Sequence, residues 1–128
     1  TANGGFSTGT PWLKVNSNYE KLNANAQDKD ENSPLNYFRK LTALRKAEPT
    51  LVYGKYTLID KDNENTYAYI RELNGKKLLI LLNFKATESF VKTEFDLSKA
   101  RVLLGNYKDF STDGKLKPYQ AVILELSN

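Results

Sequence analysis

The segment from Ser33 to Pro49, SPLNYFRKLTALRKAEP, constrains the fold most, because both of its ends and its apolar face are marked. Ser33 can accept a hydrogen bond from a free N–H of the first helical turn, and Pro34 suits the first helical position, where no N–H is needed. Pro49 opposes continuation, since the residue before a proline avoids helical geometry. Apolar side chains recur between these ends at helical spacing: Leu35, Tyr37, Phe38, Leu41 and Leu44. The pattern predicts one amphipathic helix.

After this helix nearly every segment is typical of a β-strand. Six stretches rich in β-branched, aromatic and aliphatic residues are separated by turn sequences: Val52–Ile59, Thr66–Leu73, Lys76–Phe84, Ser89–Phe95, Arg101–Leu104 and Tyr119–Leu126. Asn74–Gly75 is a strong hairpin signal, and hairpins pair strands antiparallel. The continuous apolar run in Lys76–Phe84 predicts a central strand buried on both faces. We expect a mainly β fold, an antiparallel, Greek-key-like β-sandwich of about six strands, preceded by an irregular loop segment and one α-helix.

Individual residues predict local features of this fold. Gly54 is interpreted as a bulge in the first strand. Asn23 is placed to cap a short helix within Tyr19–Asp30. Three aromatic residues on the strands are expected to pack in the core: Tyr67, Tyr69 and Phe84.

Residues 1–19 combine glycine, threonine, serine and asparagine without periodicity, which is typical of a loop. Four side chains in this loop are too apolar for a free linker: Phe6, Trp12, Leu13 and Val15. Two interpretations are open. They anchor the loop on another part of the protein, or an aromatic-bearing loop lines a pocket.

Composition restricts the available chemistry. The 128-residue chain has no cysteine and no histidine, which excludes thiol nucleophiles, Ser–His catalysis and the commonest zinc ligands. We expect no metal site and no cofactor. The carboxylate pairs Asp60/Asp62 and Asp109/Asp113 lie in turn sequences, and we interpret them as turn formers, so no catalytic residue is predicted. The chain also lacks methionine, which leaves open that it is a fragment.

Charge and hydropathy bear on partners. The net charge of +4 is scattered along the chain, whereas nucleic-acid binding favours a clustered basic stripe, so no nucleic-acid partner is expected. The longest apolar run, Leu78–Leu82, is far shorter than the roughly 20 residues of a membrane span, so no membrane partner is expected. The absence of cysteine agrees with a reducing compartment. We expect a cytoplasmic location, and any export signal would lie upstream.

Motifs in both halves resemble one family. The run GFSTGTPWLKVNSNY, residues 5–19, resembles a stretch that follows the last barrel strand in the oligo-1,6-glucosidase and α-glucosidase group of glycoside hydrolase family 13. Ser33–Leu41 resembles the last barrel helix of that group. Further stretches match in the same order: Val52–Gly54, Leu82–Phe84, Gly105–Tyr107 and Leu116–Ala121.

The resemblance implies a truncated enzyme. Residues 1–49 would be a loop and the last helix of a truncated (β/α)8 barrel, and residues 50–128 a C-terminal β-sandwich domain. The family's retaining hydrolases of α-glucosidic bonds take their three carboxylates from upstream barrel strands, so this chain would be a structural, accessory portion without catalysis alone. Phe6, Ser7 and Trp12 would border the parent's sugar pocket, because barrel active sites are built from loops that follow the strands. The implied partners are the catalytic barrel and, through it, an α-linked oligosaccharide.

One alternative function remains. A tyrosine-rich β-sandwich with one tryptophan also fits a stand-alone carbohydrate-binding module, because aromatic faces stack on sugars.

If the barrel is missing, the helix loses part of its packing surface. We then expect Leu35, Tyr37 or Phe38 to be unusually exposed, or to be covered by residues 1–19 or by self-association through the orphaned helix face.

Overall fold

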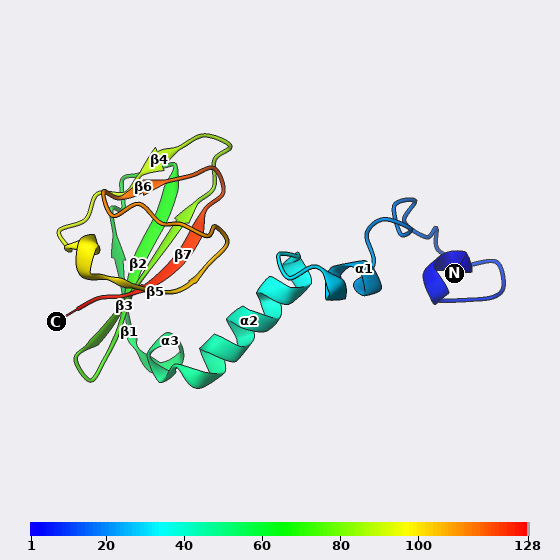
Figure 1. Ribbon diagram of the computed structural model, residues 1–128, viewed down its shortest axis with the longest axis horizontal. Helices are drawn as coiled ribbons and strands as arrows, with labels where there is room; N and C mark the ends of the chain where they lie inside the picture. Colours follow the sequence, from blue (N-terminus) through cyan, green and yellow to red (C-terminus); the bar gives the residue numbers. More distant parts are fainter. Residues whose placement is uncertain (128) are drawn as a thin grey trace. The chain divides into compact units, whose positions relative to one another are not determined.

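The computed structural model describes residues 1–127 and separates the chain into two compact units, Thr1–Lys40 and Leu41–Asn128. The first unit contains a short 3₁₀-helix η1 (Ala2–Gly5), the helix α1 (Ala24–Lys29) and the start of α2 (Pro34–Ala47). Figure 1 shows the order of these elements along the chain. No helix among residues 1–127 is long and apolar enough to cross a membrane.

The helix ends lie where the sequence predicts them. The Asn23 side chain accepts a hydrogen bond from the backbone N–H of Ala26 at 2.9 Å and caps α1. The Ser33 hydroxyl accepts one from Asn36 N–H at 3.2 Å, Pro34 opens α2, and α2 ends before Pro49. No residue of α2 is fully buried, and the Phe38 side chain is 62% exposed, as the sequence predicts, while Leu35 and Tyr37 are half-buried.

A third helix, α3 (Pro49–Tyr53), occupies the start of the first predicted strand. Pro49 does stop α2, but a proline also suits the first turn of a helix, and the Glu48 side chain accepts a hydrogen bond from Thr50 N–H at 3.2 Å. The interpretation of Gly54 as a bulge is wrong, because Gly54 closes α3. A Cβ at this position would lie 2.4 Å from Thr50 O and 3.0 Å from Glu72 N, so close backbone approach requires glycine here.

The second unit contains a five-stranded antiparallel sheet in the order β1-β2-β3-β7-β5 (Figure 1). Its strands are β1 (Lys55–Ile59), β2 (Thr66–Leu73), β3 (Lys76–Asn83), β7 (Ala121–Glu125) and β5 (Arg101–Gly105). A smaller sheet pairs β4 (Ser89–Phe90) with β6 (Lys115–Leu116), and a 3₁₀-helix, η2 (Leu97–Lys99), precedes β5. The mainly β antiparallel prediction is confirmed.

The hairpin between β2 and β3 has the predicted turn. Leu73 pairs with Lys76, so Asn74 and Gly75 form a two-residue loop with φ values of 51° and 83°. Positive φ at both positions defines a type I′ turn, whose twist matches that of the flanking strands.

Two predicted strands differ in extent, and one observed strand was not predicted. The strand predicted over Ser89–Phe95 stops at Phe90, because Lys92 N–H donates to the Asp60 carboxylate at 2.9 Å instead of to a neighbouring strand. The last strand begins at Ala121 rather than Tyr119, since Tyr119 has φ of 54° and breaks extended geometry. The short strand β6, which pairs with β4, was not predicted.

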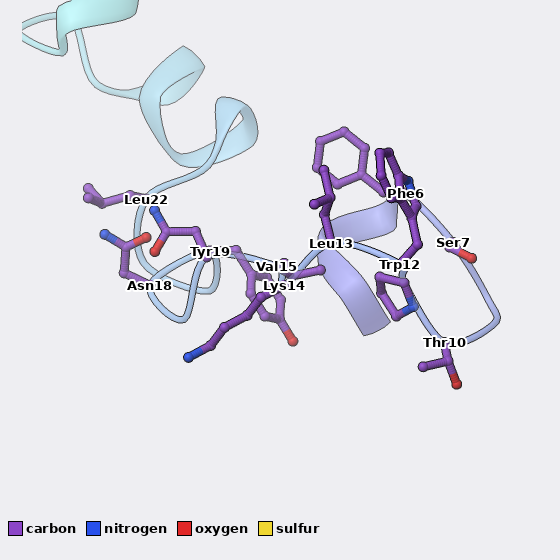
Figure 2. A pocket seen from close by; sticks show the side chains of 12 residues that line it. Phe6, Ser7, Thr10, Trp12, Leu13, Lys14, Val15, Asn18, Tyr19 and Leu22 are labelled. Carbon is purple, nitrogen blue, oxygen red and sulfur yellow. The ribbon is translucent and has the colours of Figure 1, made fainter.

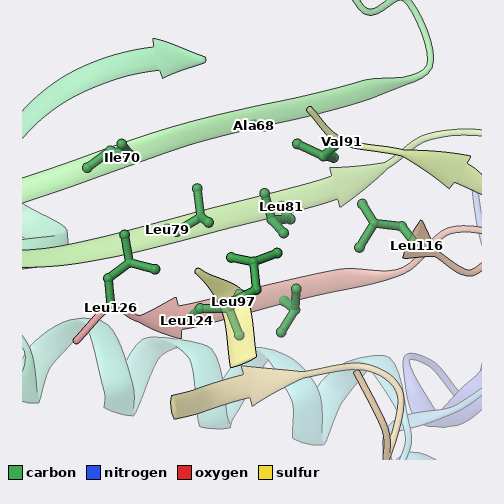
Figure 3. Close-up of a cluster of buried hydrophobic side chains, with 10 residues drawn as sticks. Ala68, Ile70, Leu79, Leu81, Val91, Leu97, Leu116, Leu124 and Leu126 are labelled. Atoms are coloured by element: carbon green, nitrogen blue, oxygen red, sulfur yellow. The ribbon is translucent and has the colours of Figure 1, made fainter. Parts of the chain in front are cut away.

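Both faces of the large sheet carry apolar clusters. Figure 3 shows the larger one, which packs one face against residues of β6, η2 and the segment after β4: Ala68, Ile70, Leu79, Leu81, Val91, Leu97, Leu116, Val122, Leu124 and Leu126. On the other face Leu78, Ile80 and Ile123 pack with Leu51 of α3, and with Leu41 and Leu44 of α2. Strand β3 contributes to both clusters, which confirms the prediction of a central strand buried on both faces.

The expectation that three strand aromatics pack in the core is wrong for two of them. Tyr67 and Phe84 are exposed, and only Tyr69 is half-buried against the second cluster. The alternation of β2 places Ala68 and Ile70 in the larger cluster, so Tyr67 and Tyr69 lie on the opposite face.

Candidate functional site

The candidate site lies within residues 1–22, where backbone geometry and one side chain shape the loop. Asn3 has φ of 53°, a left-handed conformation that asparagine tolerates better than most residues. Its side-chain amide donates to Ser7 O at 2.9 Å and to Gly9 O at 2.8 Å, and Ser7 Oγ accepts from Gly9 N–H at 3.0 Å. These bonds close residues 3–9 into a loop that presents Phe6 and Ser7.

The loop and the segment after it border a hollow of about 750 Å³ (Figure 2). All three predicted rim residues line it: Phe6, Ser7 and Trp12. Phe6 and Trp12 are 90% and 93% exposed, so their rings are available to a ligand or to another protein surface. In Figure 2 these residues lie toward one end of the hollow, with Asn18 and Leu22 toward the other.

Several lining residues were not singled out from the sequence: Thr10, Asn18, Tyr19 and Leu22. The backbone explains how two of them reach the hollow. Leu22 N–H donates to Asn18 O at 2.8 Å, and this turn brings Leu22 back toward the preceding segment. The Asn23 amide donates to Tyr19 O at 3.0 Å and fixes the same turn. No motif marks such a turn in advance, because it depends on non-periodic backbone bonds.

The lining groups suit binding rather than bond cleavage. Aromatic rings, hydroxyls, amides and the single charged side chain Lys14 surround the hollow, and no aspartate or glutamate lines it. Retaining glycosidases need two carboxyl groups about 5–5.5 Å apart. The hollow can therefore offer ring stacking and hydrogen bonds, but its own residues do not supply the pair of carboxyl groups that such a glycosidase uses.

The carboxylates Asp109 and Asp113, which the sequence predicts to be turn formers, accept hydrogen bonds from neighbouring side chains. Lys117 donates to Asp109 at 2.7 Å, and this hydrogen bond lowers the pKa of Asp109. The Ser111 hydroxyl donates to Asp113 at 2.7 Å and lowers the pKa of that carboxyl. A general acid at neutral pH needs a raised pKa, so both groups behave as ionised turn residues.

Asp60 also has a structural role in its turn. Its carboxylate accepts from the Asn63 amide at 2.7 Å and from Lys92 N–H at 2.9 Å, which ties the turn after β1 to the segment after β4. Among residues 1–127, no three acidic side chains gather where they could hold a metal ion.

Two family models match the chain in succession. Residues 1–54 match the family described as alpha amylase, catalytic domain. Residues 56–123 match the family described as maltogenic amylase, C-terminal domain.

Curated relatives cover the same span. The oligo-1,6-glucosidase of Halalkalibacterium halodurans is 41% identical over 127 residues, which cover 94% of this chain and 23% of the relative. The trehalose-6-phosphate hydrolase of Bacillus subtilis is 38% identical over 135 residues, which cover 99% of this chain and 24% of the relative. The chain thus spans about a quarter of the length of these relatives.

Solved structures are similar along the whole chain. A mutant of isomaltulose synthase from Erwinia rhapontici NX5, in complex with D-glucose, has a TM-score of 0.90 and 38% identity, covering 100% of this chain and 24% of that chain. A mutant of trehalose-6-phosphate hydrolase from Bacillus licheniformis has a TM-score of 0.88 and 34% identity, covering 98% and 24%.

Proposed function

Because the chain belongs to glycoside hydrolase family 13, with the end of an alpha-amylase catalytic domain followed by a maltogenic amylase C-terminal domain, we propose that it is the C-terminal part of a retaining α-glucosidase-type hydrolase of oligosaccharides. Its role in that enzyme is structural and accessory. The nucleophile and the general acid come from barrel strands upstream, and this chain closes and braces the catalytic domain.

The observation that carries this proposal is the difference in coverage. Four relatives named as oligo-1,6-glucosidases match 94–97% of this chain, yet the chain covers only 22–23% of their length. The chemistry of the hollow supports the same division of labour, since it has aromatic and hydroxyl groups but no carboxylate.

Hydrolysis assays test the proposal directly. We expect no release of glucose from maltose or isomaltose, and no nitrophenol from nitrophenyl α-glucoside, by the isolated 128-residue chain. The full-length enzyme that contains this chain should hydrolyse at least one of them. Turnover by the isolated chain that disappears on Asp109→Asn or Asp60→Asn substitution would contradict the proposal, and so would a full-length protein with no activity on α-glucosides.

The domain division remains part of the proposal. We place the loop and last barrel helix at residues 1–49 and the β-sandwich domain at residues 50–128. Support comes from the end of α2 at Ala47 and from the change of family model between residues 54 and 56. The immediate partner is then the catalytic barrel, and the α-linked oligosaccharide is met through that barrel. We propose a cytoplasmic location on the absence of cysteine, which suits a reducing compartment.

A second candidate function is favoured by the exposure of Trp12. A stand-alone carbohydrate-binding module would bind maltooligosaccharides without any barrel, and Trp12 is the single tryptophan, so its fluorescence reports the hollow alone. Titration of the isolated chain with maltooligosaccharides to millimolar concentration separates the two functions. A saturable change favours the module, and an unchanged spectrum favours the accessory role.

A further inference from the structure

Asn3 lies at the start of the loop of residues 3–9 and is its least exposed residue. It is half-buried, whereas the other residues between 1 and 10 are exposed. Asn3, Gly4 and Gly5 have φ values of 53°, 64° and 83°, so the backbone reverses over three successive left-handed positions. Asparagine tolerates this conformation better than most residues that have a side chain. The turn accounts for the backbone of Asn3 but leaves the use of its side chain to be explained.

The side chain and the carbonyl of Asn3 hold the rest of the loop. An asparagine amide has two hydrogens to donate, and Asn3 donates to Ser7 O at 2.9 Å and to Gly9 O at 2.8 Å. The backbone carbonyl of Asn3 accepts a hydrogen bond from Phe6 N–H at 3.2 Å. One residue therefore fixes the backbone at three later positions of the loop.

The positions fixed in this way carry groups that line the hollow. The Phe6 ring is 90% exposed, so the bonds of the loop backbone, rather than packing of the ring, set where it stands. Ser7 Oγ accepts from Gly9 N–H at 3.0 Å, which leaves the hydroxyl hydrogen for an acceptor outside the loop. Thr10 and Trp12 come shortly after Gly9, and in Figure 2 they lie toward the same end of the hollow as Phe6.

We propose that Asn3 is a positioning residue for sugar binding, which holds Phe6 and Ser7 where an α-linked glucose residue meets them. The inference rests on the proposed function and on the rim position that the sequence predicts for Phe6, Ser7 and Trp12. Asn3 is not among the residues that line the hollow, so it acts through those that do. A glucose ring has an apolar face that stacks on an aromatic ring and hydroxyls that accept hydrogen bonds. Phe6 and Ser7 offer both partners at adjacent positions.

The physical benefit of these bonds is that the loop is ordered before a ligand arrives. A loop of glycine and small polar residues that closes only on binding loses conformational freedom at that moment, and this loss weakens the affinity. The bonds from Asn3 remove much of that loss in advance. In the proposed function the carboxylates come from upstream strands, so losing the bonds should raise KM and leave kcat nearly unchanged.

Steady-state kinetics of two variants of the full-length enzyme test the inference. Asn3→Gly keeps a left-handed backbone and removes the amide. Asn3→Asp keeps the shape, but it replaces the donated hydrogens with an acceptor oxygen that faces the carbonyls of Ser7 and Gly9. For the α-glucoside that the enzyme hydrolyses, we expect KM to rise about fivefold with Asn3→Gly and further with Asn3→Asp. The value of kcat should stay within about twofold.

Thr8→Ala is the matched control. Thr8 is exposed in the same loop but is not among the residues that line the hollow, so KM and kcat should both be unchanged. Hydroxyl-radical footprinting gives a second readout, with a sulfur-linked analogue of the substrate that resists hydrolysis as the probe. The analogue should slow the modification of Phe6 about fivefold in the unmodified enzyme, because a bound ligand excludes water from the ring. At the same concentration it should protect Phe6 clearly less in Asn3→Gly.

Several results would overturn the inference. A lower melting temperature or a lower kcat with unchanged KM would limit Asn3 to stabilising the loop. Modification of Phe6 that the analogue does not slow would remove the ring from the sugar site. If Asn3→Asp does not fold, Asn3→Gly decides alone, and failure of both would assign Asn3 to folding. A full-length protein that is inactive on α-glucosides contradicts the proposed function as well, whereas an active enzyme with unaltered KM in both variants contradicts only the role of Asn3.

Discussion

Gly54 has a role that depends on space rather than on an unusual backbone angle. Its φ of −61° is open to any residue, but a Cβ added there would overlap the Thr50 carbonyl oxygen and meet the Glu72 backbone closely. Gly75 is the opposite case, because its φ is 83° and a Cβ placed there would meet no atom within 4 Å. The two glycines therefore separate crowding from backbone strain.

We expect Gly54→Ala to lower the free energy of unfolding by about 2 kcal/mol, because the new methyl group overlaps backbone atoms that belong to α3 and β2. Gly75→Ala should cost about 1 kcal/mol, through positive φ alone. Urea denaturation of the isolated chain, followed by circular dichroism, measures both. The opposite ranking would show that the Thr50 carbonyl moves aside at little cost.

Trp12 has two possible roles, at the rim of a sugar pocket or as an anchor of the loop, and substitutions distinguish them. If it borders the sugar site, Trp12→Ala in the full-length enzyme should raise KM for an oligosaccharide several-fold, whereas Trp12→Phe, which keeps an aromatic face, should restore most of the affinity. Steady-state kinetics with both variants test this. A lower melting temperature with unchanged KM would identify Trp12 as an anchor and remove it from the rim.

At the scale of elements, one lysine connects the end of α2 to the sheet. Lys76 Nζ on β3 lies 2.5 Å from Glu48 Oε2, just before α3, and 3.3 Å from Glu125 Oε1 on β7. Arg101 on β5 also pairs with Glu125. The hydrogen bond from Lys76 lowers the pKa of Glu48, and the one from Arg101 is the main cause that lowers the pKa of Glu125.

These ion pairs give a definite pH dependence. A carboxyl with a lowered folded-state pKa contributes stability above its unfolded value of 4.5, and this contribution disappears as the pH falls through the lowered value. Lys76, whose pKa is raised chiefly by its bond to Glu48, contributes below its ordinary value of 10.5 and loses the contribution as the pH rises through the raised value. The network is therefore complete between about pH 5 and pH 10.

We expect Lys76→Met to lower the free energy of unfolding by about 1 kcal/mol at pH 7, because it leaves the less exposed carboxylate of Glu48 without its main partner. The matched control is Lys115→Met. The Lys115 side chain is 37% exposed, against 36% for Lys76, but its partner Glu88 is well solvated, so the loss should be clearly smaller. Denaturation at pH 7 and pH 3 should show the Lys76 effect shrinking in acid. A loss that does not depend on pH would assign it to packing.

For the whole molecule, exposed apolar side chains are distributed over both compact units. Within the described residues, large apolar side chains are exposed in both units: Phe6, Trp12, Leu13, Leu22 and Phe38 in the first, and Tyr56, Leu58 and Tyr67 among those in the second. Patches of this kind usually mark interaction surfaces.

The isolated chain should consequently self-associate, in part through the helix face that carries Phe38. Sedimentation velocity over a range of concentrations should show a rising weight-average coefficient, and Phe38→Ser should reduce the rise because it removes exposed apolar area. The matched control is Ala43→Ser, a change at another exposed position of the same helix that removes little apolar area and should leave the rise unaltered. A monomer at all concentrations would contradict the expectation.

Local order in the sequence determined much of this protein. Ser33, Pro34 and Pro49 bound α2, Asn74–Gly75 specified the hairpin, and the apolar run of β3 indicated a buried central strand, because each effect acts between residues close in the chain. The motifs of residues 5–19 and 33–41 also indicated the family, and the three rim residues predicted from them do line one hollow.

Only the tertiary structure decided which apolar residues lie uncovered and where strands stop. Tyr67 and Tyr69 are the same residue type at alternate positions of β2, so the sequence does not distinguish them. Tyr69 packs against the second cluster while Tyr67 stays exposed, because α2 and α3 reach only part of the sheet face. The strand predicted over Ser89–Phe95 ends early because the Lys92 N–H donates to the Asp60 carboxylate instead of to a neighbouring strand. Such outcomes depend on groups that are distant in the chain and meet only on folding, so the sequence pattern carries no local signal for them.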